Sequence, residues 1–112
     1  MRGNILREEY DDLRRRIDAV NVEQKAACFN YIKLNYGPVN DSYALASGAD
    51  RERILKEVRG VCRQLWGTGN RPQALALGVV ILNIESQFMP DDDAAFVRVA
   101  TDALIKESLG DG

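Results

Sequence analysis

The sequence contains no histidine, which is the commonest general base and the commonest metal ligand in proteins. Without histidine, neither Ser-His-Asp nor Cys-His catalysis is available to the chain. Two cysteines alone cannot complete a zinc site of the usual composition. We therefore predict no catalytic residue, no metal site and no cofactor, and we interpret the protein as non-enzymatic.

The sequence also lacks a long apolar run and is poor in cysteine. The longest apolar stretch covers the 11 residues 74–84, well short of the roughly 20 residues that span a bilayer. The first 12 residues carry charges where a secretion signal requires apolar residues. Cys28 and Cys62 both lie among apolar residues in helical patterns, which favours reduced thiols over a disulfide framework. We therefore expect a soluble, cytoplasmic protein without membrane association, with a single buried disulfide as the alternative for the cysteines.

Length and composition are those of one globular domain over residues 1–112. The hydrophobic fraction is 46%, the charged fraction is 29% and the net charge is -2. A chain with this apolar content and so little net charge has enough core-forming side chains to fold. We expect one hydrophobic core, without linkers or internal repeats.

Apolar residues recur at spacings of three and four, which predicts a chain of helices. The first helix is predicted over residues 4–20. The second is predicted to begin after Asn21, whose capping box includes Gln24, and to end at Gly37-Pro38, because proline cannot continue a helix. A short helix is predicted over residues 43–46, before Ser47 and Gly48.

Three further helices are predicted in the second half. The third runs from a cap at Asp50 to Trp66, the fourth from a cap at Asn70 to Phe88, and the fifth from residues 91–93 to Gly110. The fourth helix is apolar on every side, which is typical of a central, buried helix, and Gly78 would allow a neighbour to approach it closely. Residues 79–82 also fit a strand, but no other segment provides a partner strand.

The predicted fold class is therefore all-α, a compact bundle in which four main helices and one short helix surround the buried fourth helix. The alternative is a fragment of a helical-repeat protein, because residues 70–110 have the pattern of a helical hairpin. That alternative lacks a detectable period.

Charge is distributed unevenly along the chain. Residues 51–71 hold six basic and two acidic side chains, a net of +4, whereas residues 85–112 hold seven acidic and two basic, a net of -5. On the third helix, Lys56, Arg59 and Arg63 form a ridge opposite the apolar stripe, and Trp66 lies at the edge of that stripe, next to a loop. These four residues are the predicted partner-binding surface, with a solvated helix face as the alternative for the three basic residues and a core-edge position as the alternative for Trp66. The predicted function is a non-catalytic protein-interaction or regulatory module, with self-association as one form of it.

Two alternative functions remain open. The same basic ridge, together with Arg71, could bind nucleic acid, although a sequence pI of about 5.1 argues against a dedicated nucleic-acid binder. Glu85 and the acidic run at residues 91–93 could serve a carboxylate- or metal-dependent enzyme, against the alternative of helix capping. Residues 14–16 and the loop at residues 67–69 could contact phosphate, against intrahelical ion pairing and helix capping respectively.

Overall fold

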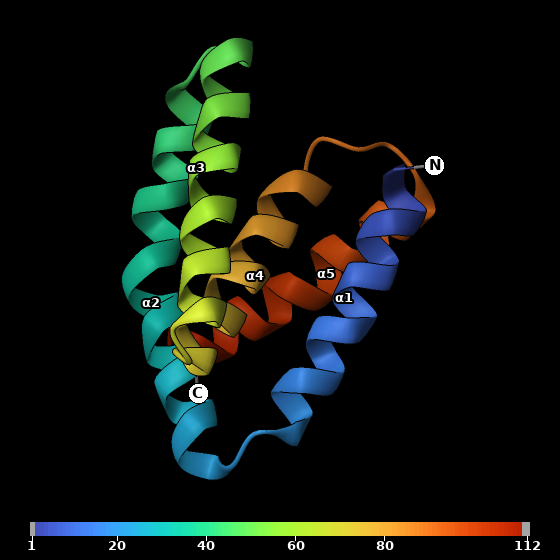
Figure 1. Cartoon of the computed structure of the whole chain (residues 1–112). Helices are drawn as coiled ribbons and strands as arrows, with labels where there is room; N and C mark the ends of the chain where they lie inside the picture. The colour runs from blue at the N-terminus through green and yellow to red at the C-terminus, as the bar shows by residue number, and fades with distance from the viewer. Residues whose placement is uncertain (1, 111–112) are drawn as a thin grey trace.

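The computed structural model describes residues 2–110, and it confirms the all-helical prediction. Five helices follow one another, α1 (Arg2–Ala19), α2 (Val22–Leu45), α3 (Gly48–Gly67), α4 (Arg71–Ser86) and α5 (Asp92–Ser108), and residues 2–110 contain no strand (Figure 1). The radius of gyration is 13.3 Å, close to the roughly 13 Å of a compact domain of 100 residues. Within residues 2–110, no helix combines the length and apolarity needed to cross a membrane. The single domain over residues 1–112 stays a prediction, and residues 1, 111 and 112 lie outside the described part.

The prediction that the second helix ends at Gly37-Pro38 is wrong. Helix α2 continues through Pro38 to Leu45, so the short helix predicted over residues 43–46 is its last turn. Proline clashes with the Cβ of the preceding residue in a helix, and Gly37 has no Cβ, which removes one obstacle. Beyond the proline, the buried Tyr43 packs against Val80 and Ile84 of α4. This tertiary packing outweighs the local preference to stop, and the fold has five helices of 16 to 24 residues.

Helix α4 is the centre of the structure, as its apolar composition predicts. Eleven of its 16 residues are buried, and it packs against each of the other four helices. Residues 79–82 are helical, which excludes the strand alternative. The main core joins α4 to α1 through Leu13 and Ile17, to α2 through Ile32, and to α5 through Val97.

A buried polar network connects α4 to α5. The Asn83 side chain is inaccessible to solvent, and its Nδ2 donates to Thr101 Oγ1 at 3.0 Å and to Asp102 Oδ1 at 2.7 Å. Its Oδ1 accepts a hydrogen bond from Gln87 Nε2 at 2.9 Å. Because both ends of the amide are satisfied, Asn83 is tolerated in an otherwise apolar helix.

Helix α3 packs less closely than the others. No side chain within Gly48–Gly67 is fully buried, even though Ile54, Val58, Val61 and Leu65 form the clearest apolar stripe in the sequence. The helix lies mainly on α4, on the other side from α1 (Figure 1). A space remains between the facing sides of α1 and α3, which lie on either flank of α4.

The N-cap of α3 is Ser47 rather than the predicted Asp50, which lies in the first turn and accepts a hydrogen bond from Ser47 Oγ at 3.2 Å.

Candidate functional site

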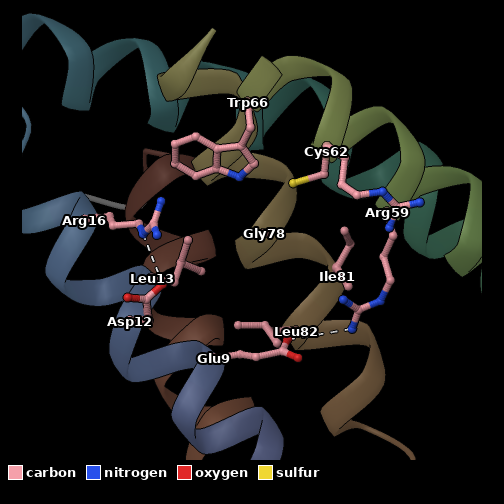
Figure 2. Close-up of a pocket in the computed structure, with 11 residues that line it drawn as sticks. Glu9, Asp12, Leu13, Arg16, Arg59, Cys62, Trp66, Gly78, Ile81 and Leu82 are labelled. Atoms are coloured by element: carbon pink, nitrogen blue, oxygen red, sulfur yellow. Dashed lines mark hydrogen bonds and ion pairs between the residues drawn. The ribbon is translucent and has the colours of Figure 1, made fainter. Parts of the chain in front are cut away.

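A pocket of about 380 Å³ lies between α1, α3 and α4 (Figure 2). Its floor is apolar, formed by Gly78, Ile81 and Leu82 of α4 with Leu13 of α1. A Cβ at position 78 would lie 3.1 Å from Leu13 Cδ1, so only glycine permits this approach of α1 to α4 without a shift. The close approach predicted for Gly78 is therefore confirmed, and it shapes the pocket floor.

The pocket walls carry charge from two helices. The α1 wall contributes Glu9, Asp12 and Arg16, and the α3 wall contributes Arg59, Cys62, Arg63 and Trp66. Three of the four predicted binding residues, Arg59, Arg63 and Trp66, therefore meet in this pocket. Lys56 lies outside it and lines an adjoining hollow of about 350 Å³, which shares Arg59 and Arg63 with the pocket.

Arg59 lies on the same side of α3 as Lys56 and Arg63, but its guanidinium is engaged by carboxylates of two other helices. Its Nε donates to Glu85 Oε1 at 3.0 Å, its Nη2 contacts the same oxygen, and Nη2 lies 3.8 Å from Glu9 Oε2. The Glu85 side chain is only 14% exposed, and a carboxylate so poorly hydrated needs a partner. Arg59 therefore joins α3 to α4 and α1.

Glu9 is the carboxylate most affected by this environment. Partial burial raises the pKa of Glu9, the nearby Arg59 guanidinium opposes that rise, and the charge of Glu85 adds to it. Burial is the largest of these causes. Protonation of Glu9 is therefore easier in the folded protein than in the unfolded chain.

Trp66 lies at the other end of the pocket, between two arginines. The guanidinium carbon of Arg16 is 4.9 Å from the ring centroid, and that of Arg71 is 6.0 Å away. Both distances are within the range of a cation–π interaction. The ring is partly buried against the main core and still faces the pocket.

Lys56 and Arg63 are the exposed cations of this surface. Neither forms an ion pair within residues 2–110, whereas Arg59 pairs with Glu9 and Glu85. The spacings of three and four residues from Lys56 to Trp66 place all four predicted residues on one side of α3. Lys56 and Arg63 are thus available to a binding partner.

Cys62 lines the pocket, which its apolar sequence neighbours do not predict. Its Sγ lies 3.4 Å from the carbonyl oxygen of Ala74, to which the thiol donates. Burial raises the pKa of Cys62, while the charges of Arg59 and Arg63 oppose that rise. Both Cys62 and the fully buried Cys28 are free thiols, as expected from the sequence.

The remaining candidates have structural partners of their own. Asp91 Oδ1 accepts the Ala94 amide at 2.8 Å and caps α5, and Asp93 lies 3.4 Å from Arg7. Glu85 pairs with Arg59 instead of joining this acidic run. Across residues 2–110, no group of three or more histidine, cysteine, aspartate or glutamate side chains is arranged to hold a metal ion.

The two weaker phosphate-contact candidates also have local explanations. Within α1, Arg16 pairs with Asp12, as the sequence predicts, Arg15 pairs with the same Asp12, and Arg14 pairs with Asp18. In the loop at residues 67–69, Gly69 has a φ of 79°, a left-handed turn after α3 that glycine adopts readily.

The α1 wall could not be found from the sequence. Glu9, Asp12 and Arg16 are ordinary members of a charged helix face, and only the tertiary structure sets them opposite Arg59 and Trp66. The comparisons with known proteins give no further guide to the site. Comparison of the chain with known protein families, curated proteins and solved structures finds no match.

Proposed function

We propose that the protein is a non-catalytic interaction or regulatory module that binds an acidic partner protein through the exposed side of α3. The observation that carries the proposal is the position of two unpaired cations, Lys56 and Arg63, beside a pocket whose wall contains Trp66. Arginine and tryptophan are enriched among residues that dominate protein interfaces, and unpaired surface cations steer acidic partners.

The distribution of acidic groups on this surface favours a protein over a nucleic acid as the binding partner. The pocket and the adjoining hollow together contain four cations and four carboxylates, namely Arg16, Lys56, Arg59 and Arg63 against Glu9, Asp12, Glu52 and Glu85. A phosphate backbone presents a regular array of negative charge and requires a surface of one sign. A protein segment can place single carboxylates opposite Lys56 and Arg63 and avoid the acidic positions.

The test is capture of partners from lysate of the native host, after nuclease treatment, by the wild type and by a Lys56→Glu/Arg63→Glu variant. A matched control is Lys33→Glu/Arg98→Glu, because these exposed residues lie in the middle of α2 and α5 and line neither hollow. Arg59 is left unchanged, since its ion pairs support the fold.

The proposal expects proteins that the wild type and the control retain and the Lys56→Glu/Arg63→Glu variant loses, with weaker retention at higher salt. Sedimentation of the purified chain identifies the case in which this partner is a second copy. Capture that vanishes with nuclease, or that is equal for all three proteins, overturns the proposal.

A further inference from the structure

We infer that the pocket between α1, α3 and α4 receives one large apolar side chain of an acidic partner segment, and that Arg63 pairs with a carboxylate next to that side chain. This inference rests on the proposed function and specifies the partner's chemistry.

The floor and size of the pocket suit a single apolar side chain. Leu13, Ile81 and Leu82 provide an apolar surface, and Gly78 deepens it by lacking a side chain. A volume of about 380 Å³ is at the small end of the roughly 300–1,000 Å³ that ligand pockets occupy. The pocket therefore has room for a leucine or phenylalanine side chain and is small for a large cofactor.

The charges lining the pocket favour one negative group. Three arginines and two carboxylates line it, and 3 − 2 leaves a formal charge of +1. Arg16 pairs with Asp12 at 3.0 Å, and Arg59 lies 3.8 Å from Glu9, so both carboxylates are already opposed by cations. Arg63 is the cation that remains, and a single carboxylate would complement it.

The extent of the surface favours a peptide chain over a small molecule. Lys56 lies seven residues before Arg63, which corresponds to roughly 10 Å along a helix. The adjoining hollow connects the two positions through Arg59 and Arg63, which line both hollows. A ligand that reaches both cations needs acidic groups about three residues apart in an extended segment, or about seven apart in a helix.

The chain contains two internal reporters of pocket occupancy. Trp66 is the only tryptophan and lines the pocket, so its fluorescence responds to a group that enters there. Cys62 also lines the pocket, whereas the other cysteine, Cys28, is fully buried. Protection of Cys62 from iodoacetamide is therefore a second, independent measure of occupancy.

The experiment selects ligands for the full chain from a display library of random 12-residue peptides that lack tryptophan and cysteine. Selected peptides are synthesised and titrated against the wild type, Arg63→Glu and Cys62→Met, the last of which places a longer side chain in the pocket. Val61→Met is the matched control, because Val61 is the exposed neighbour of Cys62 on α3 and does not line this pocket. Circular dichroism confirms that each variant is folded.

The inference expects selected peptides to place leucine, isoleucine or phenylalanine next to aspartate or glutamate. Binding should shift Trp66 emission, protect Cys62, and weaken at least ten-fold in both Arg63→Glu and Cys62→Met, with little change in Val61→Met. Phenylacetate, which has the same kind of ring and carboxylate without a chain, should bind far more weakly than the peptides.

The negative results of this experiment distinguish failure of the inferred pocket occupant from failure of the proposed docking surface. Peptides that depend on Arg63 but leave Trp66 and Cys62 unaffected would overturn the pocket and leave the proposed docking surface intact. Selection of no acidic peptide, alongside a charge-dependent partner in the capture experiment, would overturn the inference alone. Phenylacetate binding as tight as the peptides would show that the site takes a small carboxylate instead of a partner segment.

Discussion

Replacing Pro38 with alanine should stabilise the protein. Pro38 lies inside α2, where it has no amide hydrogen to donate to the carbonyl of Leu34, four residues earlier. Alanine restores that donor and removes the clash of the proline ring with the same carbonyl. The substitution therefore tests directly whether α2 is continuous from Val22 to Leu45.

The expected gain follows from two opposing effects. Proline is less favourable than alanine in a helix interior by about 3 kcal/mol. Alanine gives the unfolded chain more freedom, which offsets about 0.4–1 kcal/mol of that gain. The net increase in the free energy of unfolding is thus about 2 kcal/mol, or about 8 °C in melting temperature for a chain of this length.

The assay is thermal and urea unfolding of Pro38→Ala, followed by circular dichroism at the helix band. Gly37→Ala in the Pro38→Ala background should add about 1 kcal/mol, since an added Cβ at Gly37 meets no atom within 4 Å. Pro90→Ala is the control, because Pro90 lies outside the helices and its loss should stabilise nothing. A Pro38→Ala variant that is no more stable than the wild type would refute a continuous α2 and favour a break at Gly37-Pro38.

Three further predictions follow from buried and titrating groups. Asn83→Ala should lower the free energy of unfolding by about 2–4 kcal/mol, because it removes three side-chain hydrogen bonds and opens a cavity; a urea midpoint within error of the wild type would contradict this role. The raised pKa of Glu9 means that the folded state binds its proton more tightly than the unfolded state, so this group's contribution to stability falls as pH rises through that pKa. Glu9→Gln should therefore melt at a higher temperature than the wild type at pH 7, with a difference that shrinks toward pH 4. A melting-temperature difference that is the same at pH 7 and pH 4 would contradict the raised pKa of Glu9. Burial raises the pKa of Cys28 to about 11, so iodoacetamide at pH 8 should modify Cys62 well before Cys28 in peptide mapping, and equal rates would contradict the burial.

The sequence predicts best those features that depend on composition over a whole helix. The run from Ala74 to Ile84 has no polar face, and such a helix is stable only when other elements surround it, which is how α4 is placed. The caps at Asn21 and Asp91 are also found, because the hydrogen bonds that make them are local. These features need no knowledge of distant contacts.

Prediction fails where a distant contact decides the outcome. The local signal at Gly37-Pro38 is to stop, but Tyr43 gains more by burial against α4 than the proline costs. Arg59 has the same ridge spacing as Lys56 and Arg63, but its ion pairs with Glu85 and Glu9 of other helices could not be predicted from that spacing. The pocket is invisible in the sequence for the same reason, since its two walls come from helices with no local relation.

The loose packing of α3 and the proposed binding site are two aspects of one arrangement. No α3 side chain is fully buried, although Ile54, Leu55 and Trp66 pack against the core, so contacts at the edges of α3 add to its docking. Those contacts include the ion pairs of Arg59 and the stacking of Arg16 on Trp66, and the same groups surround the pocket. A ligand that fills the pocket would contact α1, α3 and α4 at once and would favour the conformation in which α3 is docked. Binding at the proposed site would therefore be thermodynamically linked to the docking of α3.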